Sequence, residues 1–126
     1  MTKSPLRMAA FLGAAIFSAP QMAHAAGDAT AGAVVFKRCA ICHSTVAGQN
    51  KLGPSLAGIV GRKSGTAANY TYSAAMTAYG KTWTEAELDA YLTKPSAAVP
   101  GNKMPFAGIP DATDRANVIA YLSTLK

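Results

Sequence analysis

The chain of 126 residues has few of the side chains that build metal clusters or disulfide frameworks: it contains two cysteines and two histidines. A structural zinc site takes four ligands. Beyond the segment Cys39–His43, which holds both cysteines and one histidine, the only other histidine is His24. The inventory therefore argues against a zinc site, and it leaves no disulfide framework to predict.

Several patterns are absent as well. The sequence has no block of Lys or Arg and no interleaving of basic with aromatic residues, which argues against binding to nucleic acid. It shows neither the alternating apolar pattern of β-strands nor the strand–helix–strand pattern expected around a thioredoxin-like redox pair. Internal repeats and interdomain linkers are also missing. These absences predict a single all-α domain.

The N-terminal segment has the pattern of a secretory signal peptide. Lys3 and Arg7 precede the apolar run Met8–Ala19, which is too short to span a bilayer as a helix. Small residues at positions 23 and 25 then form a cleavage site. We expect cleavage after Ala25, which leaves residues 26–126 as the mature domain; an uncleaved membrane anchor is the alternative. Removing Lys3 and Arg7 lowers the formal net charge from +6 to +4, which favours a partner with an acidic surface.

The central motif is Cys39-Ala40-Ile41-Cys42-His43. Two cysteines at i and i+3 lie on one face of a helical turn, so both thiols can form thioether bonds to the vinyl groups of one porphyrin. The histidine that follows can offer its imidazole to the iron. The motif therefore predicts one covalent haem c, bound through Cys39 and Cys42, with His43 as an iron ligand. A plain Cys39–Cys42 disulfide is the structural alternative. Because c-type haem is attached on the outer side of the bacterial cytoplasmic membrane, we expect a periplasmic protein.

Capping residues predict where the first two helices begin, and the spacing of Val118, Tyr121, Leu122 and Leu125 predicts the last one. Asp28 caps a first helix that runs to about Ala40, the capping box at residues 84–87 opens a second through Leu92, and a last helix begins near Thr113. A short helix is expected within residues 72–78. The Gly-rich segment 51–65 and the stretch that contains Pro95, Pro100, Pro105 and Pro110 are expected to be loops.

The second axial position of the iron decides the function. The mature chain has two methionines, Met76 and Met104. A methionine is more often core filler than an iron ligand. However, Met104 lies in the constrained loop Pro100–Phe106, which can present a thioether on a fixed path.

The motifs after the cysteines follow a recognisable order: Gly53-Pro54, Gly61-Arg62-Lys63-Ser64-Gly65, Tyr72-Ser73, Trp83, Tyr91-Leu92 and the loop from Pro100 to Met104. With them, the mature chain resembles the class I cytochromes c of the bacterial cytochrome c2 and mitochondrial cytochrome c type. The resemblance implies a small single-domain fold whose helices and loops wrap around one covalently attached haem.

The resemblance also implies the axial ligation of the iron. Met104 would be the distal ligand opposite His43, and the carbonyl of Pro54 would accept a hydrogen bond from the other imidazole nitrogen. Tyr91 would hydrogen-bond the ligand sulfur.

Three further residues would face the haem propionates by resemblance: Arg62, Tyr72 and Trp83. Asn102 replaces the usual threonine, which weakens the case for a propionate contact there. The basic ring of the mitochondrial type is thin in this chain, with Arg38, Lys51 and Lys103 as candidates.

These features predict a monomeric one-electron carrier rather than an enzyme, which shuttles electrons between respiratory or photosynthetic redox proteins. Its partners would be membrane complexes approached from the periplasm. One alternative is a haem c subunit of a dehydrogenase or oxidase complex. A peroxidatic or gas-binding haem protein is another, but it needs an open iron position.

Overall fold

The computed structural model describes residues 27–126, so the signal peptide predicted for residues 1–25 lies outside the described residues. In chain order the elements are α1 (Ala29–Val35), the 3₁₀ helix η1 (Phe36–Arg38), α2 (Ala74–Tyr79), α3 (Glu85–Thr93), α4 (Pro95–Ala98) and α5 (Ala112–Ser123). The β-structure of this range is limited to an isolated bridge between Lys63 and Thr82. The predicted all-α class is therefore confirmed. None of the helices in residues 27–126 has the length and apolar character needed to cross a membrane.

Helices α1 and α3 begin where their capping residues predicted, and α5 begins at Ala112, one residue before the start predicted from apolar spacing. The carboxylate of Asp28 accepts hydrogen bonds from Thr30 N and Ala31 N, and that of Asp111 accepts one from Asp114 N. The hydroxyl of Thr84 accepts a bond from Glu87 N at 3.1 Å. Each cap satisfies backbone donors that a helix start would otherwise leave unpaired. The second half of the expected capping box is replaced, because the Glu87 carboxylate accepts its hydrogen bonds from Tyr79 and Lys81 instead.

The prediction of an unbroken loop after α3 was wrong. Pro95 begins the short helix α4, and proline is tolerated at a first helical position because its missing N–H would be unpaired there anyway. Val99 N donates to Pro95 O at 3.0 Å and closes the turn. The prolines between residues 95 and 110 therefore interrupt this segment, but they do not prevent a short helix from forming in it.

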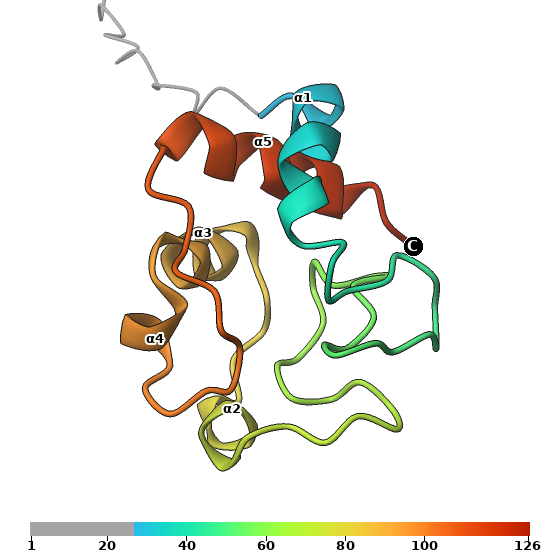
Figure 1. Cartoon of the computed structure of the whole chain (residues 1–126), viewed down its shortest axis with the longest axis vertical. Helices are drawn as coiled ribbons and strands as arrows, with labels where there is room; N and C mark the ends of the chain where they lie inside the picture. The colour runs from blue at the N-terminus through green and yellow to red at the C-terminus, as the bar shows by residue number, and fades with distance from the viewer. Residues whose placement is uncertain (1–26) are drawn as a thin grey trace, which may run out of the picture.

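The two end helices cross at the top of the molecule, where α1 lies against α5 (Figure 1). Gly32 is buried at the crossing, and a Cβ at this position would overlap the carbonyl of Asn117. The rings of Phe36 and Tyr121 pack with centroids 5.0 Å apart. Asp28 N donates to the side-chain oxygen of Asn117 at 2.8 Å. The missing side chain of Gly32 thus sets how closely the two helices approach.

Below the crossing, the chain forms two walls. In Figure 1 the long loops that follow η1 lie on one side, α3, α4 and the segment leading into α5 lie on the other, and α2 lies at the bottom. The buried apolar core is contributed by both walls and by the crossing: Val35, Phe36, Ile59, Trp83, Leu88, Tyr91, Leu92, Val99, Ile109, Val118, Ile119 and Leu122. The fold therefore brings residues 39–43 and 102–104 to opposite sides of one interior.

Replacing Gly32 with Ala should destabilise the protein by about 3 kcal/mol, because the added methyl forces α1 away from α5. The control is Gly58→Ala. Gly58 has φ +64° and open space around its Cβ position, so only the backbone strain of about 1 kcal/mol applies. Guanidinium chloride unfolding followed by circular dichroism measures both variants. Equal losses of stability would contradict the close-approach role of Gly32.

Candidate haem-binding site

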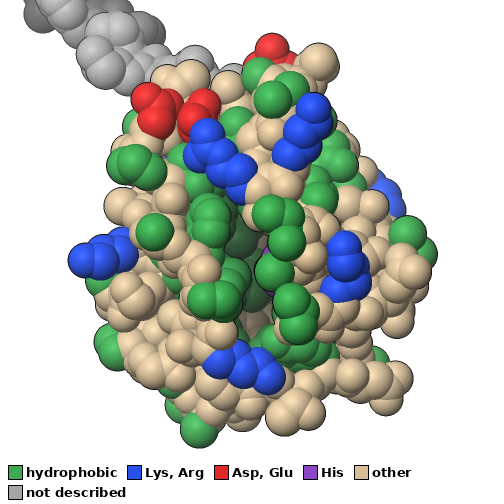
Figure 2. Space-filling model, in the orientation of Figure 1, with side chains coloured by type: hydrophobic (Ala, Val, Ile, Leu, Met, Phe, Trp, Pro, Cys, Tyr) green, Lys and Arg blue, Asp and Glu red, His purple; other side chains and the backbone are tan. Residues whose placement is uncertain are grey.

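A hollow between the two walls is lined with apolar side chains and opens on the face shown in Figure 2, where part of a histidine side chain is visible inside it. Among the described residues the only histidine is His43. The histidine of the cysteine motif therefore lies beside an apolar interior. A large planar apolar group with a metal at its centre needs a site of this kind.

Cys39 and Cys42 lie on one turn of backbone. Cys42 N donates to Cys39 O at 3.0 Å, and His43 N donates to the same oxygen at 2.9 Å. Both cysteines are free thiols and are partly buried. The structure therefore has no disulfide between Cys39 and Cys42, which was the alternative interpretation of the motif. Burial raises the pKa of the Cys39 thiol. The turn holds the two cysteines at i and i+3 beside His43, which is the spacing that attachment at two vinyl groups needs.

The imidazole of His43 is oriented by residues 53 and 54. Its Nδ1 lies 2.7 Å from the carbonyl oxygen of Pro54, and a bond there requires Nδ1 to carry the proton. Burial lowers the pKa of His43, so the neutral ring is favoured. Nε2 is then the free nitrogen that can bind a metal. A Cβ on Gly53 would overlap the imidazole, so this glycine leaves the space that the ring occupies.

Met104 is held by Asn102 and Tyr91. The amide group of Asn102 donates to Pro95 O at 3.0 Å and to Val99 O at 2.8 Å, and its oxygen accepts from Met104 N at 2.9 Å. The hydroxyl of Tyr91 lies 3.9 Å from the Met104 sulfur. Both Asn102 amide hydrogens are used inside the protein, so this residue shapes the loop instead of facing a propionate.

Met76 lacks this kind of support. It is partly buried on α2 and packs against the core, and its backbone N–H donates to the Ser73 hydroxyl at 3.1 Å. Among residues 27–126, Tyr91 gives its hydroxyl to the sulfur of Met104 and not to that of Met76. The structure therefore distinguishes the two methionines that the sequence offers.

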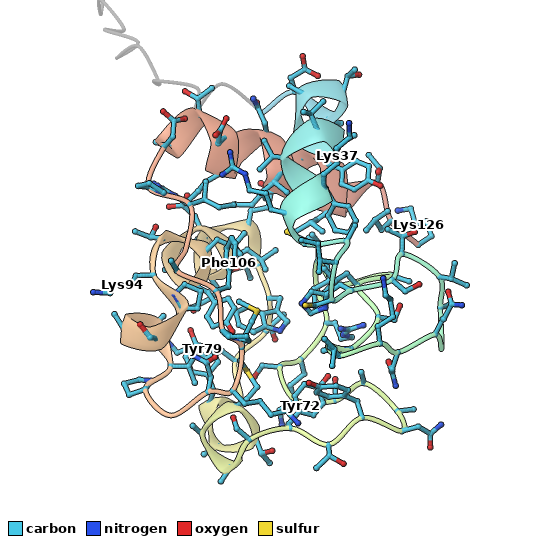
Figure 3. The ribbon with its side chains drawn as sticks, viewed as in Figure 1. Lys37, Tyr72, Tyr79, Lys94, Phe106 and Lys126 are labelled. Carbon is cyan, nitrogen blue, oxygen red and sulfur yellow. The ribbon has the colours of Figure 1, made fainter. Side chains whose placement is uncertain are left out.

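The three predicted propionate partners all retain unused donors. The guanidinium of Arg62 donates to Ser55 O at 2.9 Å and to Ala57 O at 3.2 Å, which leaves other N–H groups available, and burial lowers its pKa. The hydroxyl of Tyr72, labelled in Figure 3, accepts from Ala67 N at 3.0 Å and keeps its own proton to donate. The indole of buried Trp83 has no hydrogen-bond acceptor within the described part of the chain. Donors of this kind fit a group that carries carboxylates into a partly buried site.

The roles of two supporting residues could not be predicted from the sequence. Gly53 belongs to the Gly53-Pro54 motif, but only the structure shows that its missing side chain makes room for His43. Arg115 has 12% of its side chain exposed; it pairs with Asp89 at 2.9 Å and donates to the carbonyl of Ile109 at 2.9 Å and to that of Pro110 at 3.0 Å. It ties the segment after Met104 to α3 and α5. Its pairing with Asp89 could not be predicted from a local pattern, because the two residues are 26 positions apart.

Known proteins are similar to this chain over most of the residues that the structure describes. Residues 29–126 match the family described as cytochrome c. The chain is 48% identical over 102 residues to cytochrome c2 of Rhodoblastus acidophilus, which covers 80% of this chain and 95% of the relative. It is 51% identical over 100 residues to the cytochrome c-type protein cyt cy of Rhodobacter capsulatus, which covers 79% of this chain; the match spans only half of that relative's length.

A solved structure agrees. Cytochrome cH from Methylobacterium extorquens matches with a TM-score of 0.74 and 43% sequence identity, covering 78% of this chain and 99% of that one. Members of this family bind haem c covalently through a motif of the Cys39–His43 kind and carry electrons without being enzymes. The chain belongs to the cytochrome c family and is an electron carrier with covalent haem c.

Proposed function

We propose that the chain is a periplasmic one-electron carrier whose haem iron is bound by His43 and Met104. The observation that carries the proposal is that each side chain is oriented by its own hydrogen bond, His43 by the Pro54 carbonyl and Met104 by the Tyr91 hydroxyl. The two segments come from opposite walls of the hollow (Figure 1).

A pair of axial ligands selects electron transfer from among the reactions of haem proteins. When bound, the haem supplies an iron centre that gains and loses one electron. A thioether ligand such as Met104 favours the ferrous state and raises the reduction potential. Both axial positions would then be filled, which leaves none for oxygen or peroxide. The hydrogen bond to Pro54 holds the His43 ring in one orientation and increases its basicity as a ligand.

The propionates of the haem would be received by Arg62, Tyr72 and Trp83. Each of these has a donor that the protein does not use, and all three come from different segments of the chain. Charge-assisted hydrogen bonds from a half-buried guanidinium would offset the cost of removing a carboxylate from water.

The partner surface should surround the mouth of the hollow. Figure 2 shows Lys and Arg side chains distributed around this opening, with the acidic groups of this face gathered near the top. Lys51 donates to Ala40 O at 2.7 Å and Lys103 donates to Thr71 O, so both ammonium groups are held at fixed places. Ile41 and Leu52, with 74% and 80% of their surface exposed, add apolar contact. We expect the monomer to dock on redox proteins with acidic rims, including membrane complexes reached from the periplasm.

Export is tested by the mass of the protein isolated from a bacterial host able to attach c-type haem. A signal peptide over residues 1–25 predicts a chain that begins at Ala26 and carries one haem. Reduction with a thiol should leave the haem attached, because thioether bonds are not disulfides. A mass that includes residues 1–25, or a haem-free mass, would contradict the corresponding part of the proposal.

Met104→Ala tests the second ligand, with Met76→Ala as the matched control. Met104→Ala should remove the sulfur-to-iron charge-transfer band of the ferric protein and lower the reduction potential by on the order of 0.1 V, a fraction of the roughly 0.8 V over which axial ligands set haem potentials. Met76→Ala should keep the band. Visible spectroscopy and redox titration measure both effects. An unchanged spectrum in Met104→Ala would reject the ligand assignment, and a high-spin spectrum in the unmodified protein would favour a peroxidatic function.

A further inference from the structure

Three aromatic rings form a row between Met104 and the surface of the protein. The ring centroids of Tyr79 and Trp83 are 5.6 Å apart, and those of Trp83 and Tyr91 are 4.9 Å apart. Tyr91 in turn reaches the Met104 sulfur at 3.9 Å. Trp83, which is the single tryptophan of the chain, and Tyr91 are buried, with 6% and 7% of their surface exposed. Tyr79 is half-buried at the end of α2.

Tyrosine and tryptophan are among the side chains that lose an electron most readily. Rings at these separations can exchange an electron rapidly, so an electron vacancy formed on any one of the three is shared with the others. Where it settles depends on where a proton can leave, because a phenol that has lost an electron becomes a strong acid.

Tyr79 has a base as its hydrogen-bond partner. Its hydroxyl donates to a Glu87 carboxylate oxygen at 2.7 Å (Figure 3 labels Tyr79). The hydrogen bond from Tyr79 and the nearby Lys81, whose Nζ lies 3.4 Å from the other carboxylate oxygen, lower the pKa of Glu87 and keep it ionised at neutral pH. Burial and the same hydrogen bond raise the pKa of Tyr79 to about 12, so the proton stays on the phenol until the ring is oxidised.

Among residues 27–126, neither of the other two rings has a protein base in contact. The hydroxyl of Tyr91 faces a thioether, which is a weak acceptor and does not take up a proton at neutral pH. The indole N–H of Trp83 has no protein acceptor among residues 27–126; in the holoprotein its proposed partner is a haem propionate that also pairs with the Arg62 guanidinium. Tyr79 is therefore the only ring of the row with a protein base positioned to take its proton, so we expect the electron vacancy to settle there.

We propose that Tyr79, with Glu87 as its proton acceptor, is the residue to which an electron vacancy formed in the interior of this protein moves and at which it is then reduced. A one-electron radical oxidant takes an electron from Trp83, and Trp83 recovers it from Tyr79. The phenolic proton passes to Glu87, which leaves a neutral tyrosyl radical and a protonated carboxyl group. A small-molecule reductant such as a thiol returns one electron to Tyr79, and Glu87 returns the proton. The row thereby spares Trp83 and the Met104 sulfur from permanent oxidation.

The test treats the ferric holoprotein with azide radicals, which are one-electron oxidants, in the presence of a nitroso spin trap. Peptide mass mapping then locates the trapped adduct and the oxidised tryptophan. In the unmodified protein the adduct should lie on Tyr79. Tyr79→Phe should abolish that adduct and raise oxidised Trp83 several-fold. Glu87→Gln, which keeps the shape of the side chain but cannot take up the proton, should lower the Tyr79 adduct several-fold.

The matched control is Tyr121→Phe. This tyrosine packs against Phe36 and is not part of the row, so its loss should change neither product. Circular dichroism verifies that each variant is folded. If Trp83 oxidation stays unchanged in Tyr79→Phe, Tyr79 reacts only by direct encounter with the oxidant, and the proposal is rejected. A Tyr79 adduct that is insensitive to Glu87→Gln would make the hydrogen bond a structural tether alone.

Discussion

The hydrogen bond from Nδ1 of His43 to the carbonyl of Pro54 is the interaction on which the proposed site depends most. It requires three conditions at once: a turn that presents His43 beside the cysteines, a loop that returns to the same place eleven residues later, and a glycine at position 53 that leaves space for the ring. The backbone supports the second condition directly, because Gly53 N donates to Cys42 O at 2.8 Å. A ligand side chain is thus oriented by main-chain groups, which cannot rotate away as a side-chain partner could.

On the opposite wall, Met104 is positioned mainly by side chains that fix the backbone around it. Asn102 fixes the loop by bonding to two carbonyls and to the backbone of Met104, and Arg115 ties the following segment to α3 and α5. Met104 itself has a flexible side chain. Its position therefore relies on a rigid backbone around it and on the Tyr91 hydroxyl at its sulfur. The close crossing of α1 and α5 closes the top of the hollow that both walls share.

Much of this could be predicted from the sequence where the signal is local. Asp28 and Thr84 mark helix starts because a cap acts within three residues, and Cys39–His43 indicates haem because attachment depends on adjacent positions. The start of α5 was predicted from apolar spacing, and its Asp111 cap was not. The role of Met104 required resemblance to a family, since spacing alone does not distinguish it from Met76. The roles of Gly53 and Arg115 could not be predicted, because each depends on a group that the folded chain brings near. The Asn102 partners are local, but its bonds depend on the turn that the loop adopts, which the sequence does not specify. Helix α4 was missed because proline was taken as a breaker at the one helical position where it is tolerated.

The claim that Met104 binds the iron can be tested most directly by nuclear magnetic resonance of the reduced holoprotein labelled with carbon-13 in the methionine methyl groups. A methyl group held over the porphyrin face experiences a large upfield ring-current shift. The account predicts one such methyl signal, assigned to Met104 by its proximity to the ring of Tyr91, while the Met76 signal stays within the ordinary range. A spectrum in which neither methyl is strongly shifted, or in which the shifted methyl belongs to Met76, would contradict it.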